Sequence, residues 1–185
     1  MLPDAPRIIP LELDQVPDED VEPFGGRSNP RCELNFFKTL IQHPSLLKSY
    51  TPFAMQLGAT PLIPLRDKEI VIFRTCFLCH EIYESAHHMH IARQAGLTDE
   101  EIEAARYGGA GLPPFERALV TAVEELVSEQ CISNDTWEVL AERYTAEQLI
   151  ELVFMVGNYT LLAMVNNSLG IQPEEDVEHA WKPGG

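Results

Sequence analysis

The densest chemistry of this 185-residue chain lies between residues 74 and 90, where the sequence reads Arg-Thr-Cys-Phe-Leu-Cys-His-Glu-Ile-Tyr-Glu-Ser-Ala-His-His-Met-His. If the later part of this segment is helical, Glu81, Glu84 and His88 lie on one face, because residues three, four and seven apart share a side of a helix. Glu84 can then hydrogen-bond His88 directly. A carboxylate that orients an imidazole fixes its tautomer and raises its basicity, as acid–base chemistry requires. The same pair also occurs on solvated helix faces without a catalytic role, where it contributes ~0.2–0.5 kcal/mol.

Four neighbouring side chains are candidates for contacting a substrate. Arg74 is suited to hold a carboxylate, Tyr83 can donate a hydrogen bond to a carbonyl, and His80 and His87 lie close to the acidic pair in sequence. A structural ion pair for Arg74 and a core position for Tyr83 are the simpler interpretations.

A metal site is another interpretation of the same stretch, because His80, Glu84 and His88 follow one another at intervals of four residues. Zinc and iron sites need three or four converging ligands. One straight helix rarely presents more than two of them, so we expect no metal and no other cofactor.

The pair Cys76-Phe-Leu-Cys79 has three interpretations. Free cysteines are among the most buried residues, so two buried thiols are the default. If Cys79 lies near the N-terminus of the following helix, the helix dipole would stabilise its thiolate, and a redox disulfide with Cys76 becomes possible. The third interpretation is covalent haem attachment, since His80 completes a Cys-x-x-Cys-His pattern. That chemistry goes with export, and no export signal is visible.

The chain around this stretch has helical patterns throughout. Apolar residues recur at helical spacing, and no alternating run is long enough for a sheet. Thr98 begins a capping box with Glu101, while Ser133 and Thr145 also resemble helix caps. Gly96 is suited to end the helix that carries the acidic pair. We predict an all-α fold of about seven or eight helices, over residues 34–41, 44–58, 66–78, 81–95, 98 onward, 113–129, 133–143 and 145–169.

Composition bounds the remaining organisation. Residues 1–29 are rich in proline and predict an extended arm, residues 30–172 a helical domain, and residues 173–185 an acidic tail. The formal net charge of −16 argues against nucleic acid and anionic membranes as partners. The apolar stretch Leu149 to Val165 contains Glu151 and Asn158, so we expect a core or oligomer-interface helix rather than a membrane span. With no signal peptide visible, we expect a cytoplasmic protein.

Several segments together resemble the carboxymuconolactone decarboxylase family. They are Leu65-Arg-Asp-Lys-Glu69-Ile-Val-Ile-Phe-Arg74, Tyr83-Glu84-x-x-His87-His88, Ala92-Arg-Gln-Ala-Gly96-Leu-Thr-Asp-Glu-Glu-Ile102, Asp135-Thr-Trp137 and Gln148-Leu-Ile-Glu-Leu-Val-Phe-x-Val-Gly157. The resemblance covers roughly residues 30–172. It implies the all-helical, oligomeric fold of the alkylhydroperoxidase D-like superfamily, whose members include decarboxylases of aromatic degradation and thiol reductases.

The two branches of that family differ at the residues that carry the chemistry. The thiol branch has a Glu, a Cys-x-x-Cys that begins twelve residues later, and a His four residues after the second Cys. By this resemblance Glu69 and His88 match the Glu and the His, whereas Glu81 and Glu84 occupy the two cysteine positions. Carboxylates cannot form a disulfide, so the resemblance favours the decarboxylase branch.

These observations lead to one expected function and two alternatives. We expect a carboxy-lyase that acts on a small cyclic or aromatic-derived carboxylic acid or lactone, with His88 as general acid or base, held by Glu84, and Glu69 and Glu81 in a proton-relay network. The first alternative is a thiol peroxidase or disulfide reductase that uses Cys76 and Cys79. The second is a non-catalytic helical oligomer. The expected partners are a small-molecule substrate and further copies of the chain, as a dimer, trimer or hexamer.

Overall fold

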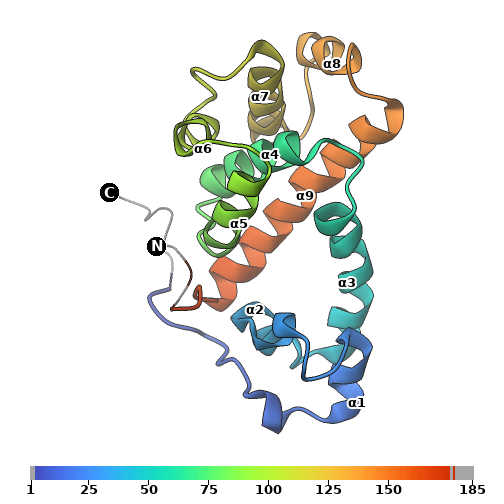
Figure 1. The fold of residues 1–185 in the computed structure, drawn as a ribbon, viewed down its shortest axis with the longest axis vertical. Coiled ribbons are helices and arrows are strands. Elements are labelled where there is room, and N and C mark those ends of the chain that lie inside the picture. Colours follow the sequence, from blue (N-terminus) through green and yellow to red (C-terminus); the bar gives the residue numbers. More distant parts are fainter. Residues whose placement is uncertain (1–2, 176, 178–185) are drawn as a thin grey trace.

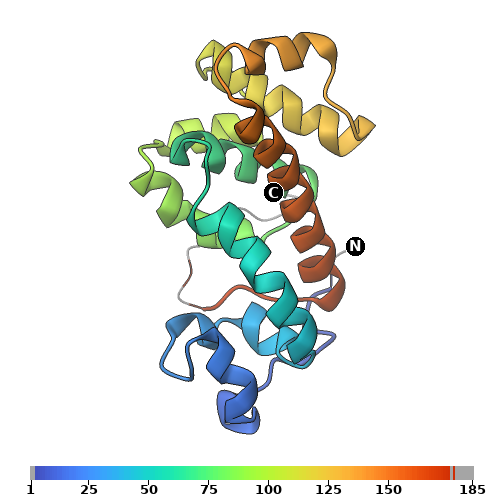
Figure 2. The ribbon, with the colours of Figure 1, turned by 90° about the vertical axis from the view of Figure 1, so that its right-hand side faces the viewer.

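The computed structural model describes residues 3–175 and 177, and within them the chain forms helices and no strands, which confirms the all-α prediction (Figure 1). The two views place α7 and α8 at one end of the molecule and the short N-terminal helices at the other, with α3 and α9 between them (Figure 2). The α-helices are α1 (Asp18–Val21), α2 (Asn35–Leu40), α3 (Pro44–Ala59), α4 (Leu65–Leu78), α5 (Tyr83–Gln94), α6 (Asp99–Arg106), α7 (Pro114–Glu129), α8 (Asn134–Ala141) and α9 (Ala146–Leu169).

Helix α4 lies at the centre of the main core. It packs against α5, α6, α7 and α9, and its residues 67–76 are all buried. This explains why its sequence reads as an apolar run with almost no amphipathic pattern, since a helix covered on every side has no solvent face. Charged residues inside α4, including Glu69 and Arg74, must therefore find partners on the surrounding helices.

The predicted helix ends agree with the structure where local capping decides them. Thr98 and Glu101 form the expected capping box, and Ser133 accepts a hydrogen bond from the backbone of Thr136. Thr145 heads a second capping box, at the start of α9. Gly96 has the left-handed backbone expected after α5, with φ of +90°.

The turn between α4 and α5 differs from the prediction. The backbone N–H of His80 donates to Phe77 O and that of Glu81 donates to Cys76 O, which together form a Schellman motif. His80 takes the left-handed position, with φ of +53°, that glycine usually occupies. Helix α5 consequently begins at Tyr83 rather than at residue 81, and Glu81 precedes the helix instead of lying on its face.

The N-terminal arm is extended only over residues 3–12. Residues 13–33 form the short turns η1 (Leu13–Gln15), η2 (Glu22–Phe24) and η3 (Pro30–Glu33), together with α1. Leu13, Val16, Val21 and Cys32 join Phe37 of α2 and Leu47 of α3 in a second, smaller core. The extended part is tied to the end of α9, since Arg7 N donates to Leu169 O over 2.8 Å. Of the predicted acidic tail, residues 176 and 178–185 lie outside the described residues.

Helix α9 is the one described helix that is long and apolar enough to span a membrane, judged by length and composition, and half of that stretch is buried. The buried Glu151 is tolerated within this helix because its carboxylate accepts hydrogen bonds from the backbone N–H groups of Leu62 and Ile63, at 2.6 and 2.9 Å. The face turned away from the core exposes a stripe of apolar residues: Ile150, Val153, Phe154, Leu161 and Met164. That a second copy of the chain covers this stripe stays a prediction.

Candidate acid–base site

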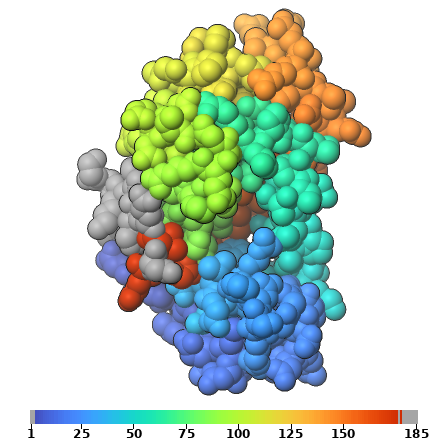
Figure 3. Space-filling view, in the orientation of Figure 1, coloured from blue at the N-terminus to red at the C-terminus, as the bar shows by residue number. Residues whose placement is uncertain are grey.

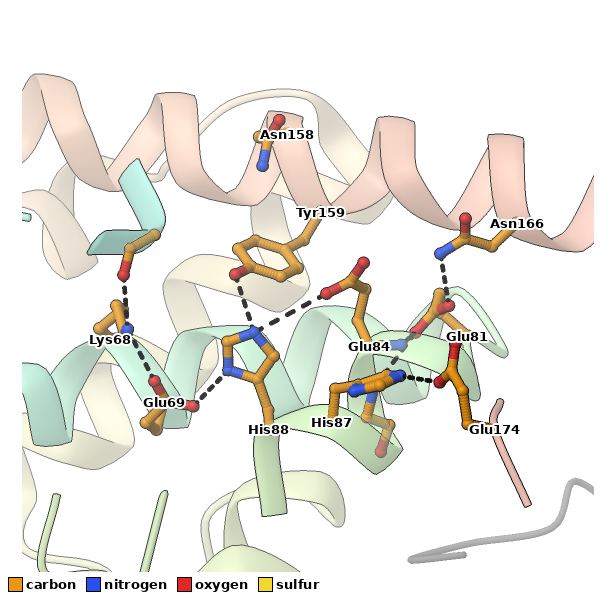
Figure 4. Close-up of polar contacts among 12 residues, drawn as sticks. Lys68, Glu69, Glu81, Glu84, His87, His88, Asn158, Tyr159, Asn166 and Glu174 are labelled. Carbon is orange, nitrogen blue, oxygen red and sulfur yellow. Dashed lines mark hydrogen bonds and ion pairs between the residues drawn. The ribbon is translucent and has the colours of Figure 1, made fainter. Parts of the chain in front are cut away.

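The imidazole of His88 is held between three helices. Its Nδ1 lies 2.6 Å from Glu69 Oε2 on α4, and its Nε2 lies 3.1 Å from the hydroxyl of Tyr159 on α9 (Figure 4). The whole residue is 7% exposed and Glu69 is fully buried. Because a carboxylate only accepts hydrogen bonds, Nδ1 carries the proton and Nε2 is the nitrogen left for proton transfer.

Glu84 contacts His88 less closely than the sequence suggests. Its carboxylate lies 3.8 Å from His88 Nε2, within ion-pair range but beyond a hydrogen bond. The predicted direct hydrogen bond is therefore wrong, because Glu69, 19 residues away on a packed helix, takes the role of orienting the ring. Glu84 instead faces the nitrogen at which a proton would be exchanged, and 15% of its side chain remains exposed.

Lys68 supplies a positive charge behind Glu69. Its Nζ lies 2.9 Å from Glu69 Oε1 and donates to Gly58 O at the end of α3, also over 2.9 Å. The ion pair does not have hydrogen-bond geometry, so Oε1 has no hydrogen-bond partner among the described residues. Both side chains are almost fully buried, which makes the charge pairing necessary for stability.

These contacts set the protonation of the central pair. Burial alone lowers the pKa of His88, but the charge and hydrogen bond of Glu69 outweigh it and raise that pKa above its usual value. Burial raises the pKa of Glu69, and the His88 charge and hydrogen bond, with help from Lys68, bring it below its usual range. Both shifts favour an imidazolium beside a carboxylate over the neutral pair.

A second carboxylate lies just outside this pair. Glu81 Oε2 accepts the backbone N–H groups of Glu84 and Ser85 at the start of α5, over 2.7 and 3.3 Å. Its Oε1 accepts from the Asn166 amide over 3.0 Å. Burial, and then the charge of Glu84, raise the pKa of Glu81 to about 7. A buried carboxyl that titrates near neutrality can take up or release a proton during a reaction.

The predicted substrate-binding histidine His87 has a protein partner. Its Nε2 lies 2.6 Å from Glu174 Oε2, while Glu174 Oε1 accepts from the Tyr83 hydroxyl over 3.1 Å. Burial works against the ionised form of Glu174, but the His87 hydrogen bond and the Asn35 backbone N–H lower its pKa to about 2. Tyr83 is buried, which agrees with the core interpretation. The segment after α9 thus closes one side of the site.

Arg74 does not lie in the site. Its guanidinium pairs with Glu124 on α7 at 2.6 Å and donates to the carbonyl of Arg106. It therefore belongs to the packing of α4 against α6 and α7, and the predictions that it holds Glu69 or a substrate carboxylate are wrong. His80 is exposed in the α4–α5 turn. Among the described residues no cluster of three His, Cys, Asp or Glu side chains is arranged to hold a metal ion.

The two cysteines of the Cys-x-x-Cys pair end a helix rather than begin one. Cys76 lies in the last turn of α4 and Cys79 is the C-cap of that helix, where the dipole disfavours a thiolate. Burial, with the charges of Glu81 and Glu84, raises the pKa of Cys76 well above its usual value, and burial also raises that of Cys79. Both are free thiols. The prediction that Cys79 lies at a helix N-terminus is wrong.

Tyr159, Lys68 and Asn166 did not stand out as site residues in the sequence. Tyr159 and Asn166 are buried in the apolar helix α9, one or more turns from the buried Glu151. Polar residues repeated on the buried face of an apolar helix are the signal that points to them, since such groups must be hydrogen-bonded. The neighbouring Asn167 donates to Cys79 O and fixes the α4–α5 turn.

Comparisons with known proteins agree with this architecture. Residues 44–126 match the model of the carboxymuconolactone decarboxylase family. No curated protein sequence matches the chain.

Solved structures with the same fold have low sequence identity to the chain. A peroxidase-related protein with an alkylhydroperoxidase AhpD core from Ralstonia eutropha JMP134 has 17% identity and a TM-score of 0.73, over 94% of this chain and 95% of that one. A peroxidase-related protein from Silicibacter sp. TM1040 has 18% identity and a TM-score of 0.71, over 95% and 97%. The debrominase Bmp8, as a Cys-to-Ala variant in complex with 2,3,4-tribromopyrrole, has 19% identity and a TM-score of 0.71, over 91% of each chain. The family match over α3 to α7 and the helical architecture shared with these structures support a relationship of the chain to the carboxymuconolactone decarboxylase and AhpD-like proteins.

Proposed function

We propose that this protein is an acid–base enzyme of the decarboxylase type, which acts on a small cyclic or aromatic-derived carboxylic acid or lactone. The observation that carries the proposal is the orientation of His88. A buried carboxylate holds its Nδ1, and its Nε2 is directed toward Tyr159 and Glu84. An imidazole whose tautomer is fixed in this way is the group that general acid–base catalysis uses most often.

The proposed step breaks the bond between the substrate carbon and its carboxylate. Carbon dioxide leaves, and the bonding electron pair stays on the carbon, delocalised into the adjacent unsaturated or carbonyl group. His88 in its imidazolium form donates the Nε2 proton to that carbon, and a proton from solvent restores the imidazolium. The raised pKa of His88 supports this direction of transfer, because it increases the share of the acid form at a given pH. Glu84 and Tyr159 are the groups nearest to the transferred proton.

The charged side chains of the site restrict the kind of substrate that we propose. Glu69 and Glu84 flank the imidazole, Glu81 lies beside the start of α5, and Lys68 is already engaged by Glu69 and Gly58 O. Arg74 pairs with Glu124, and no described hydrogen bond or ion pair joins an arginine to Glu69, Glu84 or His88, so the proposed ligand is recognised mainly through its ring. The debrominase of the same fold holds a small halogenated ring compound, which supports a ring of similar size here.

The thiol alternative has less support from the geometry. A peroxide-reducing cysteine needs a populated thiolate in a positive environment. Cys76 is fully buried, and its neighbours Glu81 and Glu84 oppose ionisation. The family resemblance also assigns carboxylates to the two reactive positions, so we do not extend the peroxidase names of the structural neighbours to this chain.

The test is release of carbon dioxide from a panel of cyclic lactone acids and unsaturated ring acids. His88→Ala should lower the rate by about 10²–10⁴-fold, the usual contribution of a general acid or base. His90→Ala is the matched control, because His90 lies on the same helix, is exposed, and contacts Gln94 instead of the site. Equal rates for the parent protein and His88→Ala, with His90→Ala also unchanged, would remove His88 from the mechanism.

A further inference from the structure

An apolar cavity lies beside the acid–base site, between the N-terminal arm, α2, α3 and the second half of α9. Its volume is about 420 Å³. Figure 3 shows that the surface is hollowed between the blue N-terminal part of the chain and the helices above it. The described residues that line the cavity include no Asp, Glu, Lys or Arg, and most are leucine or another hydrocarbon side chain. A cavity of this size and lining is of the kind that binds small organic molecules.

One polar group in the cavity wall lacks a partner. Thr39 lines the cavity and is 3% exposed, and its Oγ1 has no hydrogen-bond partner among the described residues. Leaving a buried hydroxyl unsatisfied typically costs about 1–3 kcal/mol. The other polar side chains of the lining are differently placed. Gln42 and His43 are exposed, and Tyr50 donates its hydroxyl proton to Asn158 Oδ1 over 2.7 Å. The Thr39 oxygen is itself covered by protein atoms, so the lining that a ligand can touch is mainly apolar.

The cavity adjoins the site through α9 and α3. Leu162 lines the cavity and lies one turn after Tyr159, which contacts His88. Side chains three apart on a helix are neighbours, so the wall of the cavity and the partner of the imidazole share one face of α9. Tyr50 lies between the two regions, because it lines the cavity and bonds the residue next to Tyr159. The Glu84 charge contributes, after burial, to the raised pKa of Tyr50, which agrees with this placement.

We propose that this cavity binds an uncharged, mostly hydrocarbon body. This inference rests on the proposed function in one respect: the body that the cavity holds is the apolar part of the substrate. A cavity of ~150 Å³ holds benzene, so this one has room for a body of roughly ten to fifteen carbon atoms. A charged group would have no counter-ion inside the lining, and burial of an unpaired charge is strongly unfavourable.

Binding is measured first, without turnover, by the fluorescence of the neutral probe N-phenyl-1-naphthylamine added to the full chain. Val165→Phe places a larger side chain in the lining and should weaken probe binding at least tenfold. Met164→Phe is the matched control, because Met164 is the adjacent residue of α9, is 63% exposed and does not line the cavity. Circular dichroism checks that both variants fold. No binding, or equal loss in the two variants, overturns the cavity as a ligand site.

A second variant of the lining, Leu161→Phe, serves if Val165→Phe fails to fold. Leu161 lines the cavity and is 46% exposed, so the fold should accommodate a larger side chain there. Leu161→Phe should weaken probe binding while Met164→Phe does not, and equal binding by these two variants overturns the cavity as a ligand site.

The link to catalysis is separated from the binding site itself. His88→Ala should bind the probe as the parent does, because His88 does not line the cavity. In the carbon dioxide assay Val165→Phe should raise KM with kcat nearly unchanged. If turnover is found and KM does not move, the cavity is not the substrate site. If no substrate turns over in any variant, the proposed function fails while the binding result stands.

Discussion

Replacing Glu69 by Gln is the most direct test of the central pair. The variant keeps the size of the side chain and an oxygen that can accept from His88 Nδ1, but it removes the negative charge 2.6 Å from the ring. A hydrogen bond to a charged group contributes about 1.5–3 kcal/mol, which corresponds to roughly 13- to 160-fold in rate at ~1.4 kcal/mol per factor of ten. We therefore expect Glu69→Gln to lower kcat/KM by roughly ten- to a hundredfold, less than His88→Ala.

The pH dependence of stability should change with a defined sign. The folded-state pKa of His88 is raised, so its contribution is complete below its unfolded pKa of ~6.5 and is lost as the pH rises through the folded value. The folded-state pKa of Glu69 is lowered, so its contribution is present above its unfolded pKa of ~4.3 and is lost as the pH falls through the folded value. The stability difference between the parent and Glu69→Gln should be largest at about pH 4.5 to 6.5. Urea denaturation across that range measures it.

An NMR titration of the His88 ring with pH tests whether Glu69 sets the protonation of this histidine. The chain has six histidines, and the spectrum of His88→Ala assigns the signal. With the Glu69 charge removed, burial of the ring is opposed only by the more distant charge of Glu84, so the His88 midpoint should move to lower pH. A midpoint identical to that of the parent would refute the claim that Glu69 sets the protonation of His88, whatever the effect on rate.

Four other predictions test separate parts of the structure. Gly170→Ala should be less stable than Gly96→Ala, because both have positive φ but a Cβ at Gly170 would lie 2.6 Å from Ala5 O whereas nothing lies within 4 Å at Gly96; thermal unfolding compares them. In the parent, Glu81 should make the free energy of unfolding fall between pH 4.5 and 7, because a carboxyl with a folded pKa of about 7 binds more protons when folded than when unfolded. Glu81→Gln should reduce that fall, which urea titration at pH 5 and 8 measures. An equal fall in the two proteins would contradict the prediction. The exposed Cys131 should react first with a thiol reagent, and peroxide should not change the titre of the two thiols of α4; a reversible loss of two thiols would restore the redox alternative. If a second copy covers the α9 stripe, Phe154→Glu should lower the mass in sedimentation, and an unchanged mass would place the contact elsewhere.

The helices could be predicted from the sequence because local signals determine them. The capping residues Thr98, Ser133 and Thr145 fix their helix starts through contacts only three residues away. The α4–α5 turn could not be predicted in the same way, because His80 adopts a left-handed backbone without being glycine. Moving the helix start by two residues took Glu81 off the expected face.

Several residues of the candidate site could be predicted from the sequence, but not the contacts that join them across different helices. Glu69, Glu84 and His88 do lie together, but the partner of the imidazole is 19 residues away and Tyr159 is 71 residues away. Such contacts depend on how α4, α5 and α9 pack against one another, and residue spacing along one helix gives no information about that packing. Arg74 shows the same limit, since its partner Glu124 is 50 residues away on α7.

The bond between His87 and Glu174 has a practical consequence for how the chain is handled. Glu174 follows the last helix, yet its carboxylate also bonds the Asn35 backbone and the Tyr83 hydroxyl, so it joins α2 to α5 around the reactive ring. A protein shortened after residue 172 would keep every residue of the proposed proton transfer but lose the Glu174 contacts that hold α2 against α5 on one side of the site.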